Sequence, residues 1–213
     1  EKAGYDDSRT ANPTRGVLEG YIADLEGGAG GAAFGSGMAA ISSSLMLLKA
    51  GDHLIATEGL YGGTYRVLRQ VFARLDIECT FCDTTDLDAV AGAFEENTRA
   101  VLIETPSNPL MRITDIAGVS ELAHERDALV MVDNTFMSPY LQRPLERGAD
   151  LVIHSATKFL GGHSDAILGL VVAAGKGLLE RVRRVQNAFG AICSPMESWI
   201  VTRGMKTLAV RLE

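Results

Sequence analysis

The sequence predicts an α/β fold in which a mostly parallel sheet lies between helices. Short apolar segments of strand length alternate with longer amphipathic segments along the 213 residues. This order is typical of strands joined by helical crossovers and covered on both faces. Hydrophobic residues make up 46% and charged residues 22% of the chain, which suffices to bury a large core. We therefore expect one large α/β domain.

The first helix is expected at Pro13–Glu26, because Asn12 can cap it, Pro13 suits its first turn and Gly27 can end it. The other expected helices cover residues 38–49, 64–75, 87–94, 116–126, 178–186 and 195–213. The expected strands cover residues 31–34, 53–57, 77–83, 100–104, 129–132, 151–154 and 167–173.

The chain begins with Glu1 rather than Met, and its last predicted helix is still running at Glu213. We therefore expect residues 1–213 to form the large domain of a longer protein, without its N-terminal residues and its C-terminal domain.

Composition also limits the partners and the compartment. A net charge of −7 argues against nucleic acid, and no apolar run approaches the roughly 20 residues that span a bilayer. Cys79 and Cys82 have C-x-x-C spacing, but residues three apart on a strand face opposite ways, and no second pair completes a zinc site. We expect no metal site and a cytoplasmic protein.

Polar and glycine residues follow five of the predicted strands. They are Gly35-Ser36-Gly37, Tyr61, Glu104 with Asn108, Asp133, and Lys158 with the hydroxyl residues Ser155 and Thr157 before it. Ligands of open α/β sheets bind at the carboxyl ends of the strands. These residues are therefore expected to meet at one edge of the sheet.

Each residue type suits one part of pyridoxal 5′-phosphate (PLP). The helix that opens at Gly37 can bind the phosphate, with hydroxyls from Ser155 and Thr157. Tyr61 can stack on the pyridine ring, and Asp133 can keep the ring nitrogen protonated so that the ring accepts electrons. Lys158 can form the Schiff base.

Taken singly, these signals have simpler explanations: a glycine-rich turn, a helix cap at Asp133 and a surface lysine at Lys158. Gly35-x-Gly37-x-x-Ala40 also mimics a dinucleotide fingerprint, with Glu58 as its acid. The S-x-x-K spacing of Ser155 and Lys158 matches serine β-lactamases, but their companion motifs are absent. The joint placement of these residues at one sheet edge favours PLP.

Further motifs extend this pattern along the chain: Ser8-Arg9-x-x-Asn12-Pro13-Thr14-Arg15, Gly35-Ser36-Gly37-Met38-Ala39-Ala40, Tyr61-Gly62-Gly63-Thr64-Tyr65, Glu104-Thr105-Pro106-Ser107-Asn108-Pro109, Val132-Asp133-Asn134-Thr135, residues 155–165 and Arg203-Gly204-Met205-Lys206-Thr207-Leu208. Together they resemble the Cys/Met-metabolism, or trans-sulfuration, family of PLP enzymes. This family includes cystathionine γ-lyases, β-lyases and γ-synthases, O-acylhomoserine sulfhydrylases and methionine γ-lyases.

The resemblance implies the large domain of the aminotransferase-like fold (fold type I) and a homotetramer built from dimers. It also implies elimination or γ-replacement on a small sulfur amino acid, such as cystathionine, or on an O-acylhomoserine. Lys158, Tyr61 and Asp133 would be catalytic. The residues implied to bind PLP are Arg9 from the neighbouring subunit, Gly37, Met38, Tyr61, Glu104, Asn108, Asp133, Ser155, Thr157 and Lys158.

The chain departs from the family pattern in two places, and a third position bears on which member of the family it resembles. Asp7 stands where the family usually has a tyrosine that touches the partner's phosphate, and a carboxylate there is repulsive. Gly63 stands where methionine γ-lyases usually carry cysteine, which disfavours that member. The family's C-terminal domain, which supplies the arginine that binds the substrate carboxylate, is expected to be absent from this chain. The chain alone would then lack a complete substrate site. A PLP-binding protein without turnover and a dinucleotide-dependent oxidoreductase remain alternatives from other classes.

Overall fold

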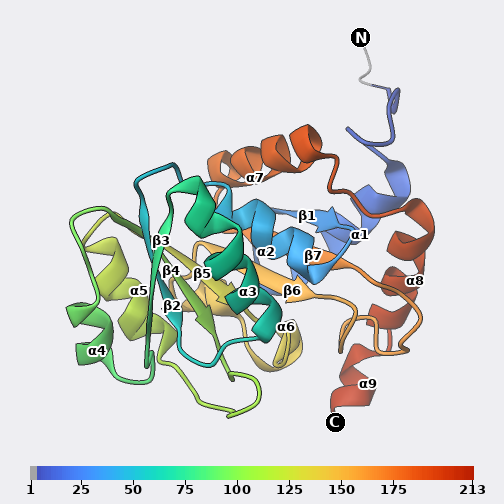
Figure 1. Ribbon diagram of the computed structural model, residues 1–213. Helices are drawn as coiled ribbons and strands as arrows, with labels where there is room; N and C mark the ends of the chain where they lie inside the picture. Colours follow the sequence, from blue (N-terminus) through green and yellow to red (C-terminus); the bar gives the residue numbers. More distant parts are fainter. Residues whose placement is uncertain (1–3) are drawn as a thin grey trace.

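The computed structural model describes residues 4–213 as one seven-stranded sheet covered on both faces by helices (Figure 1). The strands are β1 (Gly30–Phe34), β2 (His53–Thr57), β3 (Glu78–Cys82), β4 (Thr98–Glu104), β5 (Leu129–Asp133), β6 (Leu151–Ser155) and β7 (Gly169–Ala173). The helices are α1 (Pro13–Glu26), α2 (Gly37–Leu45), α3 (Gly62–Gln70), α4 (Leu87–Gly92), α5 (Ile116–His124), α6 (Ser138–Leu141), α7 (Lys176–Phe189), α8 (Pro195–Met205) and α9 (Leu208–Leu212), with 3₁₀ turns η1 (Phe72–Leu75) and η2 (Pro144–Arg147).

The sheet has the strand order β1-β7-β6-β5-β4-β2-β3. Strands β3, β2, β4, β5 and β6 run parallel, while β7 is antiparallel to both β6 and β1. Because two antiparallel steps restore the direction, β1 points the same way as β6. The predicted mostly parallel sheet is confirmed, and the turn that follows β1 lies at the same edge as the ends of β4, β5 and β6.

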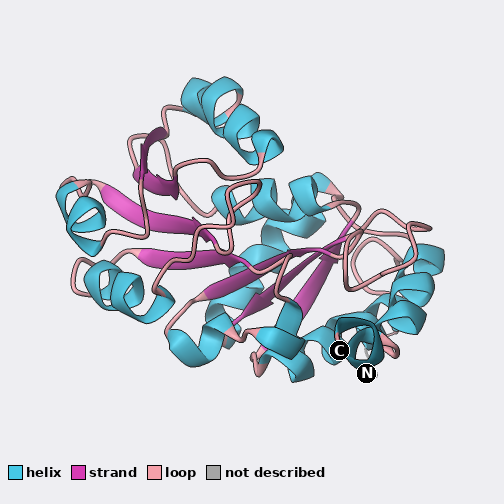
Figure 2. Ribbon diagram, turned by 90° about the horizontal axis from the view of Figure 1, so that it is seen from below, coloured by secondary structure: helices cyan, strands magenta, loops and turns pink. Residues whose placement is uncertain are grey.

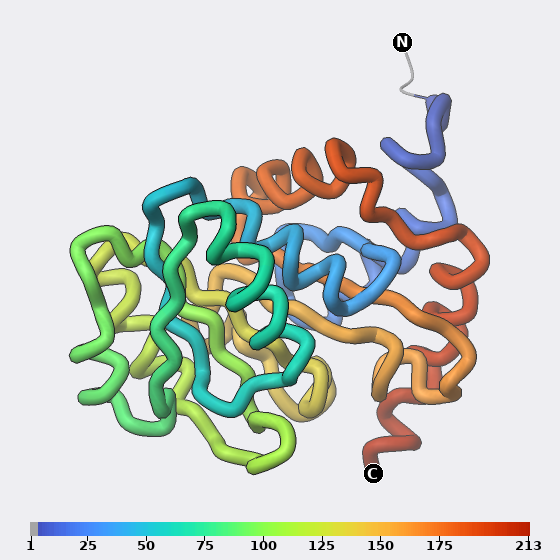
Figure 3. Tube along the Cα trace, in the orientation of Figure 1, coloured from blue at the N-terminus to red at the C-terminus, as the bar shows by residue number. Residues whose placement is uncertain are grey.

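Helices lie on both faces of the sheet (Figure 2). Because successive side chains of a strand point to opposite faces, the core forms one layer on each side. On one face, α2, α3 and α7 cover a cluster that includes Leu54 and Met131. On the other face, α5 packs on a cluster with Ile55 and Val130, and α1 and α8 share a third cluster. The trace in Figure 3 shows α1 and α8 side by side although they lie at opposite ends of the sequence.

The first helix has its predicted bounds and caps. The Asn12 side chain accepts from the N–H groups of Thr14 and Arg15, and Gly27 closes the helix with φ 73°.

Two long predicted helices are wrong, because each is interrupted. The predicted helix over residues 64–75 ends at Gln70, and η1 then turns the buried Phe72 into the core. The predicted helix over residues 195–213 divides into α8 and α9, since both the N–H and the hydroxyl of Thr207 donate to the Gly204 carbonyl and tighten the chain there. Across residues 4–213, no helix has the length and apolar character that crossing a membrane requires.

Candidate active site

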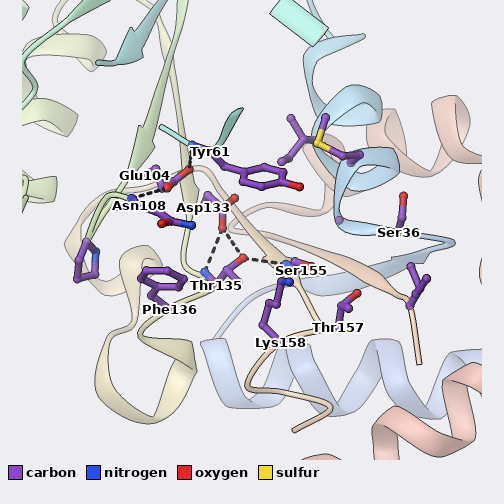
Figure 4. A pocket seen from close by; sticks show the side chains of 15 residues that line it. Ser36, Tyr61, Glu104, Asn108, Asp133, Thr135, Phe136, Ser155, Thr157 and Lys158 are labelled. Atoms are coloured by element: carbon purple, nitrogen blue, oxygen red, sulfur yellow. Dashed lines mark hydrogen bonds between the residues drawn. The ribbon is translucent and has the colours of Figure 1, made fainter. Parts of the chain in front are cut away.

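A cavity of about 280 Å³ lies where β4, β5 and β6 end, facing the start of α2 (Figure 4). The residues that line it are Ser36, Gly37, Met38, Ile41, Tyr61, Glu104, Pro106, Asn108, Asp133, Thr135, Phe136, Ser155, Thr157, Lys158 and Ile167. Every residue predicted to bind PLP is among them except Arg9. The predicted meeting of the strand-end residues at one sheet edge is therefore confirmed, whereas Arg9 was expected at the phosphate of the neighbouring subunit.

The start of α2 forms one wall of the cavity. Ser36 caps the helix by accepting from the Ala39 N–H at 3.0 Å. The first N–H groups of a helix have no carbonyl partner within it, so the wall presents donors and the positive end of the helix dipole. A Cβ at Gly37 would lie 2.8 Å from the Cβ of Ser155, so only glycine lets the helix approach β6 this closely.

The carboxylate of Asp133 lies at the centre of the cavity floor (Figure 4). Its Oδ1 accepts from the N–H of Thr135 at 3.0 Å and from the Thr135 hydroxyl at 2.5 Å. Burial raises the pKa of Asp133, while the Thr135 hydrogen bonds and the charge of His154 oppose this rise. The Thr135 hydroxyl also accepts from the Ser155 N–H at 2.8 Å. Thr135 therefore joins the ends of β5 and β6.

The Glu104 carboxylate joins the two loops beside the cavity. Oε2 accepts from the N–H of Tyr61 at 2.8 Å, and Oε1 accepts from the N–H of Asn108 at 2.9 Å. Burial and the nearby negative charge of Asp133 raise the pKa of Glu104 from its ordinary 4.5 to about 7. Glu104 thus holds the backbone of Tyr61 and Asn108, which specifies the supporting role that the family resemblance implied for it.

Tyr61 precedes α3, and its half-exposed ring lies across the cavity from Lys158 (Figure 4). A Cβ at Gly63 would lie 2.5 Å from Cε1 of Tyr61 and 2.9 Å from Sδ of Met38. Any side chain at position 63 would therefore displace the ring. A Cβ at the adjacent Gly62 would meet nothing within 4 Å.

Lys158 lies in the turn after β6, where its N–H donates to the Ser155 carbonyl at 3.1 Å. Its side chain is exposed at the boundary between the cavity and a wider adjoining cleft of about 1030 Å³. The Thr157 hydroxyl accepts from the Leu168 N–H at 3.1 Å, so the residue before β7 steadies this turn. An amine with access to solvent and to both spaces can react with a carbonyl group that enters the cavity.

A family model described as Cys/Met metabolism PLP-dependent enzyme matches residues 1–213. The chain belongs to this family. The family membership overturns the dinucleotide interpretation of Gly35-x-Gly37-x-x-Ala40. It also confirms the predicted PLP-dependent fold, which the solved relatives share.

The chain is 52% identical over 213 residues to the cystathionine γ-lyase of Bacillus subtilis (strain 168), with 100% of this chain and 56% of that protein covered. It is also 52% identical to the cystathionine β-lyase of the same organism, with 100% and 55% covered. The crystal structure of a cystathionine γ-lyase from Lactobacillus plantarum complexed with L-serine superposes with a TM-score of 0.97 at 50% identity, covering 98% of this chain and 55% of that one. The chain therefore spans about half the length of the relatives it matches.

The donor set of the cavity fits the cofactor of the family. The α2 N-terminus and the Ser155 hydroxyl offer donors for a phosphate, since the glycine at position 37 leaves the helix end open. Asp133 offers an acceptor for a protonated ring nitrogen, and Lys158 supplies the amine. The site needs an anion at one wall and a cation at its floor, and PLP carries both.

Sequence reasoning missed Ile41, Thr135, Phe136 and Ile167 as lining residues. Thr135 and Phe136 come directly after Asp133-Asn134, and Thr135 was the last residue of a recognised motif. The signal that could have found Thr135 is an Asp followed two residues later by a hydroxyl, a common local side-chain-to-backbone pattern.

Arg9 lies outside the cavity. It pairs with Asp7, and its Nη1 donates to the carbonyl of Asn187 at 3.4 Å. Its predicted contact with the neighbouring subunit stays a prediction. Cys79 and Cys82 pack against opposite faces of the sheet, as predicted, and are free thiols. Burial raises the pKa of Cys79 to about 12 and that of Cys82 to about 11.

Proposed function

We propose that the full-length protein containing this chain is a PLP-dependent lyase that cleaves a C–S bond of cystathionine by β- or γ-elimination. The observation that carries the proposal is the convergence of Lys158, Asp133 and Tyr61 with the α2 N-terminus in one cavity. The equal identities to a cystathionine γ-lyase and a cystathionine β-lyase support the substrate class.

The proposed cofactor contacts follow the walls of the cavity. The N–H groups at Gly37 and Met38 and the hydroxyls of Ser155 and Thr157 bind the phosphate. Asn108 contacts the ring hydroxyl, and Asp133 bonds the ring nitrogen. Glu104 would hold the backbone of Tyr61 and Asn108 in place at the edge of the cavity.

When bound, PLP supplies an electron sink for carbanion chemistry. Lys158 would hold the cofactor through its Nζ, and the same amine would remove the α-proton of the substrate. Asp133 keeps a negative charge against the ring nitrogen, which stabilises electrons that move into the ring. Tyr61 stacks on the ring and assists proton transfer near the leaving sulfur. The elimination releases the thiol, and water then hydrolyses the resulting imino acid to ammonia and an oxo acid.

The assembly and the compartment are part of the proposal. We propose a cytoplasmic homotetramer, built from dimers in which Arg9 of one subunit reaches the phosphate in its neighbour. The position of Arg9 outside its own cavity and the free thiols of Cys79 and Cys82 support this.

The test is an assay of the PLP-loaded full-length protein with cystathionine, O-succinylhomoserine, O-acetylhomoserine and methionine. β-Elimination yields pyruvate and homocysteine from cystathionine, whereas γ-elimination yields 2-oxobutanoate and cysteine. Thioether formation from an O-acylhomoserine and a thiol would instead indicate a γ-synthase or sulfhydrylase. PLP binding without any turnover would support the non-catalytic alternative.

A further inference from the structure

A cluster of three buried polar side chains and one partly buried glutamine lies beneath the cavity. It consists of Glu26, Asn134, Gln142 and His154, which we call the buried polar network. Glu26 is the last residue of α1, and its side chain, like those of Asn134 and His154, is 0% exposed. None of these residues lines the cavity.

Hydrogen bonds connect the members of the network. Glu26 Oε1 accepts from His154 Nε2 at 2.6 Å and from Asn134 Nδ2 at 3.1 Å. Asn134 Nδ2 also donates to the carbonyl of Gln142 at 2.8 Å. The Gln142 side chain donates to Asn134 Oδ1 at 2.9 Å and to the carbonyl of Thr105 at 3.2 Å.

Two members of the network, and one residue that the network binds, are adjacent in sequence to residues that line the cavity. Asn134 follows Asp133, and His154 precedes Ser155. Thr105, whose carbonyl the network binds, follows Glu104. Successive residues at the ends of strands point to opposite faces of a sheet. The network therefore ties the ends of β4, β5 and β6 together from the face opposite the cavity.

The burial of the Glu26–His154 pair is not explained by stability alone. A buried ion pair is often no more stable than apolar residues of similar volume, so its presence suggests a further use. Glu26 Oε2 and His154 Nδ1 have no hydrogen-bond partner among the described residues, which adds to the cost of this arrangement. In the sheet register, Asp133 pairs with Ile153, directly beside His154. Burial raises the pKa of Asp133 overall, and His154 is among the neighbours that oppose this rise.

We propose that the Glu26–His154 pair is a positioning device for the cofactor site. Glu26 fixes the His154 side chain next to Ile153, the register partner of Asp133, and it holds Asn134 so that the turn after Asp133 keeps its geometry. This inference rests on the proposed PLP function, because Asp133 and Ser155 are the residues it positions. Glu26 and His154 touch neither cofactor nor substrate and act through their neighbours.

The test compares variants of the PLP-loaded full-length protein. Glu26→Gln keeps the shape of the side chain but removes the charge, and the double variant Glu26→Gln/His154→Gln leaves no unpaired buried charge. His53→Gln is the matched control, since His53 is a buried histidine at the start of β2 that bonds Thr98 and Thr80 far from the cavity. The measurements are the PLP dissociation constant, the pH dependence of the cofactor absorbance, and kcat and KM.

We expect the single and double network variants to bind PLP about tenfold more weakly, the ratio that corresponds to about 1.4 kcal/mol. We expect kcat to fall with little change in KM, and the pH midpoint of the cofactor absorbance to move. His53→Gln should leave all these values at those of the parent. If Glu26→Gln fails to fold, the double variant still carries the test.

Parent values of PLP affinity, absorbance midpoint and kcat in the double variant would overturn the inference while leaving the proposed function intact. Equal losses in His53→Gln and the network variants would overturn it as well, since they would reflect general loss of stability. A parent protein that binds no PLP would refute the proposed function itself, and the inference with it.

Discussion

The carboxylate of Asp7 lies 3.6 Å from Nη2 of Arg9, and its Oδ1 accepts from the Arg9 N–H at 2.9 Å. Both side chains are 53% exposed. The acid that replaces the usual tyrosine of the family is therefore turned toward the arginine proposed to reach the neighbouring phosphate. The Asp7 carboxylate offsets part of the positive charge with which Arg9 could bind an anion. The effect on binding is small, because exposed ion pairs have interaction free energies of only about 0–1 kcal/mol.

Replacing Asp7 should tighten cofactor binding in the assembled protein. Asp7→Asn frees the Arg9 guanidinium, and Asp7→Tyr also restores the residue typical of the family. We expect the PLP dissociation constant to fall by up to about fivefold, the ratio for about 1 kcal/mol. The measurement is PLP retained by intact oligomers during dialysis. Asp6→Asn, which removes the adjacent acid, is the control, and equal dissociation constants for Asp7→Asn and the parent would refute the idea.

Removing the amine of Lys158 should abolish both covalent attachment of PLP and turnover. The residue is the one lysine amine at the cavity wall, and no other lining residue carries an amine. We expect Lys158→Ala to lose the visible absorbance of the attached cofactor and all lyase activity. Lys176→Ala, at the exposed start of α7, should behave as the parent. Normal turnover in Lys158→Ala would end the present interpretation of the site.

The layout of the site was predictable because it depends on strand direction and local motifs. The ends of β4, β5 and β6 are each a buried apolar run followed by a polar residue, so Glu104, Asp133 and Ser155 could be assigned to one edge from sequence alone. The order of strands was not predicted, since pairing depends on contacts between segments far apart in the chain. The same limit hid the antiparallel direction of β7.

Long-range hydrogen bonds explain the remaining omissions. In the sequence, Glu26 precedes a glycine turn and resembles an ordinary helix end. In the structure, its carboxylate accepts a hydrogen bond from His154, which is 128 residues away. The Glu104 carboxylate binds the Tyr61 N–H across 43 residues. Neither pairing has a local sequence signal, because both arise where the folded sheet brings loops together.

The space beside Tyr61 should tolerate no side chain at position 63. Because a Cβ on Gly63 would collide with the Tyr61 ring, we expect Gly63→Ala to tilt the ring and lower kcat by about tenfold, with a smaller effect on stability. Gly62→Ala is the matched control, since its Cβ meets nothing. Steady-state kinetics of the two variants with cystathionine test this. Equal kcat values would show that the ring position matters little.

The charge of Asp133 should matter more than its shape. Asp133→Asn keeps an acceptor for Thr135 but loses the charge-assisted bond to the ring nitrogen, worth about 1.5–3 kcal/mol. We expect PLP affinity to fall by about tenfold or more and kcat to fall further, because the electron sink depends on the protonated ring. The control Asp115→Asn alters only the cap of α5. Wild-type rates for Asp133→Asn would refute the assignment.

Glu104 should make the cofactor-free protein less stable as pH rises. Its folded pKa of about 7 exceeds the ordinary 4.5, so the folded protein binds more protons than the unfolded chain between these values. The stabilising effect of the bound proton is complete below pH 4.5 and is lost as pH rises to about 7. At about 1.4 kcal/mol for each pH unit, the loss amounts to at most about 3 kcal/mol.

The variant Glu104→Gln isolates this contribution, since glutamine can still accept from one of the two N–H groups but carries no titratable proton. Urea unfolding of cofactor-free protein at pH 5 and pH 8 gives the two free energies of unfolding for each form. We expect the parent to lose up to about 3 kcal/mol more than Glu104→Gln between these pH values. Because the negative charge of Asp133 contributes to the raised pKa, Asp133→Asn should reduce the difference. Parallel pH dependences in the parent and Glu104→Gln would mean that Glu104 titrates normally, and that Asp133 does not act on it.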